Sequence, residues 1–296
     1  MKEQKLMGVF APITTPFLLN GAVDYRGLEK NMQFYAASGI KGYLALGSNG
    51  ENKSLTNDEK LRVLEIIMKN KASDQTVIAG CIFESTFETI QMAKKMEAFR
   101  PGFLTLLPPS YFKKQMTDPV LYKYFTDVAD AVDTPCLIYN APQFCGGTTL
   151  SIPLIKQLSE HKNIVGIKDS STDNIESILF AVRDTFNVMA GSVNFFMTAL
   201  LLGGVGGVIS LANVFPSITN ELYTLTVAKK YEEAIALNDR ILQINKAVSG
   251  RGGVAAVKYA MDLAGLAGGV PRLPLFPIDD DSKNSIRAKL KQEGLI

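Results

Sequence analysis

Residues 164–170 read Ile-Val-Gly-Ile-Lys-Asp-Ser, a short apolar run that ends abruptly in three polar residues. A near-continuous apolar run of this length is typical of a strand buried on both faces, as in a parallel sheet. Runs of the same kind recur along the chain, and we count eight of them: residues 8–13, 42–46, 76–80, 103–107, 136–139, 164–167, 187–190 and 207–210.

The segments between these runs carry helical patterns with recognisable starts. Thr56 and Ser85 each precede a Glu by three residues, as in a capping box, and Asp118 precedes a Pro, as an N-cap does. Ser171 or Asp173 is expected to cap a further helix. Strands and helices therefore alternate, and eight such units predict an α/β fold, the (β/α)8 TIM barrel. A doubly wound open sheet is the alternative, but we find no GxGxxG or Walker motif to favour it.

The last part of the chain has a purely helical pattern. Helices are expected over residues 217–229, 231–248, 254–263 and 282–293. We therefore expect a barrel over residues 1–225, which carries the active site, and a C-terminal helical extension over residues 226–296 that packs on it.

Composition excludes several classes of protein. Of 296 residues, 47% are hydrophobic and 20% charged, which is typical of a folded globular chain. Lys and Arg (31) nearly balance Asp and Glu (29), so we expect no nucleic-acid or membrane partner. Three cysteines without a CxxC pair indicate neither a disulfide framework nor a zinc site. With no signal-like or spanning apolar segment, a cytoplasmic location is expected.

The chain has a single histidine, His161, which excludes any mechanism that needs two. It is expected to be a surface residue that precedes a strand. If the protein is an enzyme, its protons are therefore moved by Lys, Tyr, Asp, Glu or hydroxyl groups.

The functional face of such a barrel lies at the carboxyl ends of the strands, and Lys168 is placed there. A buried ammonium is costly, so we expect its pKa to fall, and a neutral amine can form a Schiff base with a ketone. The alternative is a structural salt bridge to Asp169 or Glu51. Tyr139 ends the neighbouring strand and is a candidate proton carrier, or else a core tyrosine.

Two further strand ends carry candidate binding groups. Ser48 and Asn49 lie in a Gly-flanked turn whose successive backbone N–H groups could hold a carboxylate. Asp169 is expected to stand at a helix entry or to support the site rather than to catalyse.

Three motifs together carry a resemblance: GSNGE (residues 47–51), IYNAP (138–142) and GIKDSS (166–171). The combination resembles the dihydrodipicolinate synthase / N-acetylneuraminate lyase family, whose members are Schiff-base enzymes that handle pyruvate. The similarity runs from residue 8 through the last helix, essentially the whole chain.

The resemblance implies a role for each matching residue. Lys168 forms an imine with the keto carbon of pyruvate or another 2-keto acid, with no metal or other cofactor. Tyr139 donates and accepts protons, and Ser48 links it to Tyr111 in a proton relay. Tyr111 reaches into a neighbouring subunit's site, which implies a homotetramer built as a dimer of dimers.

The resemblance also implies how the substrate is bound. The N–H groups of Ser48 and Asn49 hold its carboxylate, and the carbonyl of Ile209 lies near the imine. Ser170 and Asn49 bind its distal end. Gly191 and Ser192, which end the seventh strand, are further candidates for substrate binding.

Departures from the family pattern point to a subfamily. Synthases that condense pyruvate with aspartate semialdehyde carry an arginine where this chain has Phe144, and that arginine binds a second carboxylate. Sialic-acid lyases carry an acidic pair after the glycine of the seventh strand, where this chain reads Gly191-Ser192-Val193-Asn194 and has no carboxylate. The motifs are most similar to those of 4-hydroxy-2-oxoglutarate aldolases and 2-keto-3-deoxy acid aldolases.

We therefore expect an aldolase that cleaves or forms a 4-hydroxy-2-keto acid, with pyruvate as the imine-bound partner. The first alternative is 4-hydroxy-tetrahydrodipicolinate (dihydrodipicolinate) synthase, which condenses pyruvate with aspartate semialdehyde. Further alternatives are a keto-deoxy sugar-acid dehydratase and a catalytically silent binding relative that keeps the barrel.

Overall fold

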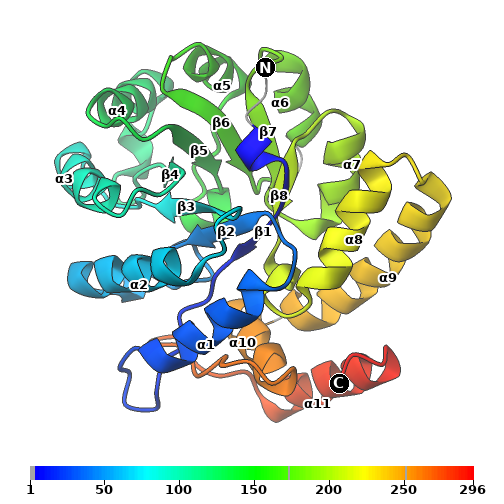
Figure 1. The fold of residues 1–296 in the computed structure, drawn as a ribbon. Helices are drawn as coiled ribbons and strands as arrows, with labels where there is room; N and C mark the ends of the chain where they lie inside the picture. The colour runs from blue at the N-terminus through cyan, green and yellow to red at the C-terminus, as the bar shows by residue number, and fades with distance from the viewer. Residues whose placement is uncertain (1–3, 173, 251) are drawn as a thin grey trace.

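The computed structural model describes residues 4–172, 174–250 and 252–296. Its centre is a closed barrel in which each strand pairs in parallel with the next and the eighth pairs with the first (Figure 1). The strands are β1 (Gly8–Pro12), β2 (Gly42–Ala45), β3 (Thr76–Gly80), β4 (Phe103–Leu106), β5 (Cys136–Asn140), β6 (Ile164–Asp169), β7 (Asn187–Ala190) and β8 (Gly206–Val208). The prediction of a (β/α)8 barrel is confirmed.

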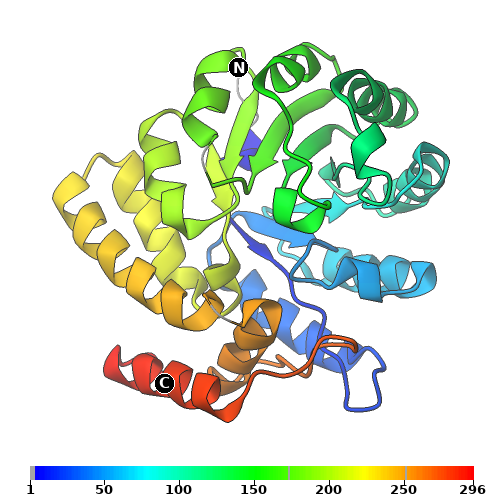
Figure 2. The same ribbon diagram turned by 180° about the vertical axis from the view of Figure 1, so that it is seen from behind.

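Helices surround the barrel, and Figure 2 shows the same ring from the opposite side. Those that follow the strands are α1 (Tyr25–Ala36), α2 (Asn57–Asn70), α3 (Thr86–Glu97), α4 (Asp118–Asp130), α5 (Ile152–Ser159), α6 (Ile175–Ala181), α7 (Phe196–Leu201) and α8 (Pro216–Val227). The C-terminal helices are α9 (Tyr231–Ser249), α10 (Gly253–Leu263) and α11 (Asp280–Gln292).

Two apolar layers hold the barrel together. The larger layer lies between the strands and the surrounding helices. The smaller layer fills the barrel interior, where alternate strand residues point inward, and consists of Leu6, Phe10, Leu44, Ile78, Phe103, Leu137, Met189, Val205 and Val208. A filled interior leaves polar side chains room only at the strand ends.

Six strands differ from their predicted bounds at the carboxyl end: β1, β2, β4 and β5 by one residue, and β6 and β8 by two. β6 continues through Lys168 and Asp169, because both residues still pair with β5 on one side and β7 on the other. β8 is short because the chain turns at Ile209, whose N–H donates to the Phe10 carbonyl while its own carbonyl accepts from Ala212, at 2.9 and 3.0 Å.

The predicted helix starts are mostly correct. Thr56 and Glu59 form the full capping box, whereas Ser85 caps α3 alone, because Glu88 accepts a hydrogen bond from Asn57 instead. The N-cap of α4 is Thr117 rather than Asp118, which is already helical.

The start of α6 was predicted wrongly. Its N-cap position is Asn174, and the Ser171 hydroxyl donates to the Asp169 carboxylate instead of capping the helix. Asp173, the other predicted cap, lies outside the described residues.

His161 precedes β6 as expected, but its side chain is only 13% exposed, because it lies against Asp130. Its Nδ1 also accepts a hydrogen bond from the Asn163 amide. The expectation of a surface residue is therefore only partly met.

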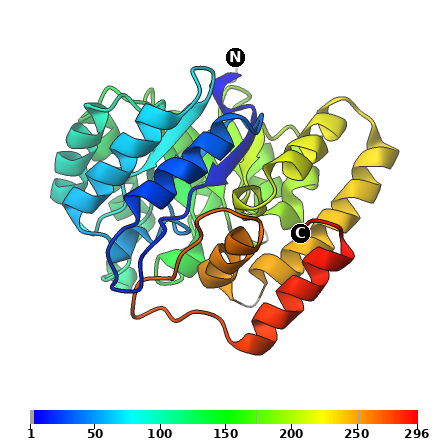
Figure 3. The same cartoon turned by 60° about the horizontal axis from the view of Figure 1, so that its bottom comes forward.

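The C-terminal helices pack on one side of the barrel (Figure 3). α9 lies against α8, and α10 and α11 pack against α9 and each other. A division into residues 1–225 and 226–296 would pass through α8, and it remains a proposal. No helix among the described residues is both long and apolar enough to cross a lipid bilayer.

Candidate active site

The end of β6 places Lys168 beside Tyr139 on β5. The two residues are register partners in the parallel ladder, and both are nearly buried. The Lys168 Nζ lies 3.8 Å from the centre of the Tyr139 ring, over its face. A protonated amine over an aromatic face is attracted by the ring, and this contact places the lysine Nζ at the cavity at the mouth of the barrel.

The turn after β2 brings a hydroxyl to the same place. Ser48 Oγ lies 3.2 Å from the Tyr139 hydroxyl. Within the turn, the amides of Gly50 and Glu51 donate to the carbonyls of Gly47 and Ser48. The next side chain, Asn49, donates from Nδ2 to Ser210 Oγ at 2.7 Å, which ties the turn to the end of β8.

These groups line a cavity of about 420 Å³, a usual size for a small-molecule site. The cavity contains most of the site residues predicted from the sequence: Ser48, Asn49, Tyr139, Lys168, Ser170, Gly191 and Ser192. Position 191 needs a glycine, since a Cβ there would lie 2.6 Å from the Asp169 carbonyl oxygen and 1.9 Å from Ser170 Oγ.

Two predicted site residues do not line this cavity. Ile209 is fully buried, and its carbonyl accepts a hydrogen bond from Ala212, while its neighbours Val208 and Ser210 face the cavity. Tyr111 is 82% exposed, and its ring packs edge-on against Phe112. The roles of Ile209 and Tyr111 therefore stay predictions.

A buried carboxylate supports the end of β6. Asp169 is fully buried and accepts hydrogen bonds from Asn140 Nδ2 at 2.7 Å and Ser171 Oγ at 2.8 Å. Burial raises the pKa of Asp169, and these hydrogen bonds oppose the rise. The sequence raised a salt bridge between Lys168 and Glu51 as one alternative. That prediction is wrong, because Glu51 pairs with Lys258.

Several lining residues were missed by the sequence reasoning: Pro12, Gln143, Thr172, Asn194, Phe195, Val208 and Ser210. Ser210 could have been found, because it is the polar residue that ends the eighth run. Gln143 donates to the Ser170 carbonyl at 3.3 Å, a contact between two loops that no sequence pattern indicates.

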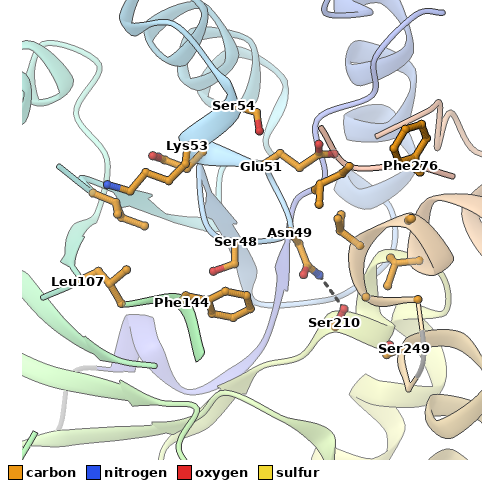
Figure 4. Close-up of a pocket in the computed structure, with 18 residues that line it drawn as sticks. Ser48, Asn49, Glu51, Lys53, Ser54, Leu107, Phe144, Ser210, Ser249 and Phe276 are labelled. Carbon is orange, nitrogen blue, oxygen red and sulfur yellow. Dashed lines mark hydrogen bonds between the residues drawn. The ribbon is translucent and has the colours of Figure 1, made fainter. Parts of the chain in front are cut away.

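A second cavity, of about 550 Å³, adjoins the first (Figure 4). The two share Ser48, Asn49, Phe144 and Ser210, and Figure 4 shows the Asn49–Ser210 hydrogen bond at their common wall. The far side of this second cavity is formed by α10 and by the segment that holds Phe276.

No metal-binding group is found among the residues that the structure describes, since nowhere do three or more His, Cys, Asp or Glu side chains cluster suitably. The three cysteines are buried and free.

The model of the dihydrodipicolinate synthetase family matches residues 5–293. The chain belongs to this family. Membership confirms the resemblance seen in the sequence, and the protein is therefore an enzyme of the carbon–carbon lyase, or aldolase, type.

Two relatives show how far the similarity extends. The 4-hydroxy-tetrahydrodipicolinate synthase of Acidiphilium cryptum is 32% identical over 98% of this chain and 99% of its own length. The enzyme of the same name from Gluconacetobacter diazotrophicus is 29% identical over the full length of both chains.

Solved structures of this family are similar to the chain over nearly its whole length. A dihydrodipicolinate synthase from Acinetobacter baumannii, in complex with pyruvate, superposes with a TM-score of 0.93 at 29% identity, covering 98% of this chain and all of that one. The Aquifex aeolicus synthase gives 0.91 at 28% identity, covering 98% of each chain.

Proposed function

We propose that this enzyme is a class I lyase that forms an imine between Lys168 and pyruvate, without a metal or other cofactor. The observation that carries the proposal is the convergence of the Lys168 amine, the Tyr139 hydroxyl and the Ser48 hydroxyl on one cavity. The pyruvate complex of the Acinetobacter baumannii relative supports the choice of keto acid.

The chemistry follows from these positions. The Lys168 amine adds to the keto carbon of pyruvate, and Tyr139 delivers a proton to the resulting hydroxyl, which leaves as water and gives the imine. The Tyr139 phenolate then takes a methyl proton, which gives an enamine. The enamine carbon attacks the aldehyde and forms the new C–C bond, while Tyr139 returns the proton to the aldehyde oxygen. The reverse sequence cleaves a 4-hydroxy-2-keto acid, and water releases pyruvate from Lys168.

The Ser48 hydroxyl, 3.2 Å from that of Tyr139, passes the proton onward in this scheme. The amides of Ser48 and Asn49 hold the pyruvate carboxylate, as successive backbone N–H groups do at other anion sites. Ser170, Gly191 and Ser192 face the same cavity and contact the distal part of the substrate.

The comparisons support aspartate semialdehyde as the aldehyde partner. The relatives described above carry the name 4-hydroxy-tetrahydrodipicolinate synthase. This favours the condensation reaction over the 4-hydroxy-2-keto acid aldolase that the sequence motifs placed first.

A specific observation favours the aldolase as a second candidate. Phe144 lines both cavities and offers only apolar surface. Lys168 is the one cationic side chain that the described part of the chain contributes to the 420 Å³ cavity. A second carboxylate bound there without a charged partner would cost several kcal/mol, on the order of 3–5.

Steady-state kinetics separate the two candidates. The values of kcat/KM are compared for pyruvate with aspartate semialdehyde and for the cleavage of 4-hydroxy-2-oxoglutarate. A value of about 10⁴ M⁻¹s⁻¹ or more for the condensation, within the ordinary enzymatic range, supports the synthase. If kcat/KM for the condensation is at least about a hundredfold lower than kcat/KM for the cleavage, the result supports the aldolase.

The oligomer and the location remain proposals. Tyr111 and Phe112 are 82% and 62% exposed, and such a pair of aromatic side chains suits a subunit contact. A homotetramer of this chain would cover them, and analytical ultracentrifugation measures its mass. A cytoplasmic location fits the buried free cysteines.

A further inference from the structure

The turn that carries Ser48 and Asn49 ends at a buried ion pair with the C-terminal helices. Glu51 pairs with Lys258 of α10, and their side chains are 1% and 0% exposed. Figure 4 shows Glu51 leading away from Ser48 and Asn49 toward the C-terminal part of the chain. The pair therefore joins two regions that are far apart in the sequence.

Both members of the pair have further partners. Lys258 Nζ donates to the Val270 carbonyl at 2.9 Å and lies 4.4 Å from the centre of the Phe17 ring. The second carboxylate oxygen of Glu51 accepts the Arg272 amide at 2.9 Å. The Glu51 side chain is thus held at both oxygens by residues beyond the barrel.

Arg272 fixes the chain that follows the turn. Its guanidinium donates to the Ser54 carbonyl at 2.7 Å and to both carboxylate oxygens of Glu59 at 2.7 Å. It also donates to the Gly21 carbonyl. The segment from Glu51 to Glu59 is therefore anchored to one C-terminal loop.

The backbone of Glu51 needs such an anchor. Its φ is 51°, in the left-handed region, which costs a non-glycine residue of order 1 kcal/mol and persists where the surroundings impose it. Two residues earlier lies the amide of Asn49, which we assign to the substrate carboxylate. A change in the Glu51 backbone would reorient the amides of Ser48 and Asn49.

A buried ion pair contributes little net stability, because desolvation offsets its attraction. Burial lowers the pKa of Lys258, and the Glu51 carboxylate raises it part of the way back. A pair that adds so little to stability can still fix one arrangement of the chain.

We propose that the Glu51–Lys258 pair is a positioning device, through which α10 sets the geometry of the carboxylate-binding amides of Ser48 and Asn49. The proposal rests on the proposed function, since it presumes that these amides hold the carboxylate of pyruvate. Glu51 and Lys258 are positioning residues, because neither lines the 420 Å³ cavity.

The test compares pyruvate with methyl pyruvate, its uncharged ester, as ketones trapped on the enzyme by borohydride. In Lys258→Met, the pyruvate concentration that gives half-maximal trapping should rise at least about tenfold. The corresponding concentration of methyl pyruvate should stay within about twofold of the wild-type value. A general loss of structure would weaken the binding of both ketones alike. The ratio of the two half-maximal concentrations therefore reports on recognition of the carboxylate alone.

Two further variants keep the test decisive. Lys258→Met/Glu51→Gln removes the unpaired buried charge, so it should fold even where the single variant does not, and it should show the same loss of preference for pyruvate. Arg240→Met is the matched control, because it breaks an ion pair with Glu293 on the C-terminal helices without touching the turn. It should bind both ketones as the wild type does.

A wild-type preference for pyruvate in the double variant would overturn the proposal. So would an equal loss for pyruvate and its ester. Failure of the proposed function looks different, because wild-type enzyme would then trap no pyruvate on Lys168 at all.

Discussion

Lys168 and Tyr139 face each other at the ends of adjacent parallel strands, with the lysine Nζ 3.8 Å from the centre of the tyrosine ring. Their register fixes this relationship, since the strands β5 and β6 pair through these two residues and through Asn140 and Asp169 beyond them. The side chains of Asn140 and Asp169, the next pair along the two strands, are joined by a hydrogen bond of 2.7 Å. The amine and the phenol thus need little rearrangement to act on one substrate.

Removing the phenol should slow the chemistry without unfolding the protein. Tyr139→Phe keeps the buried ring but loses the hydroxyl that meets Ser48. We expect kcat to fall at least about a hundredfold, the usual scale for a positioned acid–base group. Pyruvate should still be trapped by borohydride, more slowly. Turnover within about threefold of wild type would place the proton carrier elsewhere.

Adding a cation at position 144 should favour a substrate with a second carboxylate. Phe144 is 49% exposed, so an arginine fits there without burying an unpaired charge. Phe144→Arg should raise kcat/KM for aspartate semialdehyde by about tenfold or more, because a guanidinium binds a carboxylate bidentately. Phe144→Leu is the control and should leave kcat/KM for aspartate semialdehyde unchanged. Equal effects of the two substitutions would contradict this account of specificity.

The Arg272–Glu59 contact should stabilise the fold in a pH-dependent way. Hydrogen bonds from Arg272 lower the pKa of Glu59 from its ordinary 4.5 to about 2. Because the folded-state value is depressed, this contribution to the free energy of unfolding is fully present above about pH 4.5. It is lost as the pH falls toward 2.

Glu59→Gln should therefore destabilise the protein by about 1–3 kcal/mol at pH 7, and by much less near pH 3. Urea unfolding followed at both values measures the difference. Glu65→Gln, which removes an exposed partner of Arg62, is the control and should change little at either pH. A Glu59→Gln penalty that does not shrink on acidification would show that the pair is not the cause.

The barrel was predictable because its strands are buried on both faces and therefore appear as apolar runs. Lys168 was predictable for the same reason, since it interrupts such a run at its carboxyl end. The cap of α4 was misplaced by one residue, because Thr117 and Asp118 are both good N-cap residues and only the backbone decides between them.

Contacts between distant segments could not be predicted. The sequence offered Glu51 as a partner for Lys168, whereas the fold brings Lys258 to Glu51. No local pattern links a turn after β2 to a helix near the C-terminus. The early end of β8 was missed because it depends on a turn, closed by the hydrogen bond from the Ala212 amide to the Ile209 carbonyl. Apolar runs do not reveal such a turn.

The identity of the imine-forming lysine tests the central claim most directly. The enzyme is incubated with pyruvate and borohydride, and its intact mass and peptide masses are measured, with Lys168→Ala as the control. We predict one pyruvate-derived adduct per chain, on Lys168, with no adduct and no turnover in a folded Lys168→Ala variant. An adduct on another lysine, such as the buried Lys258, or undiminished turnover in Lys168→Ala, would contradict the account.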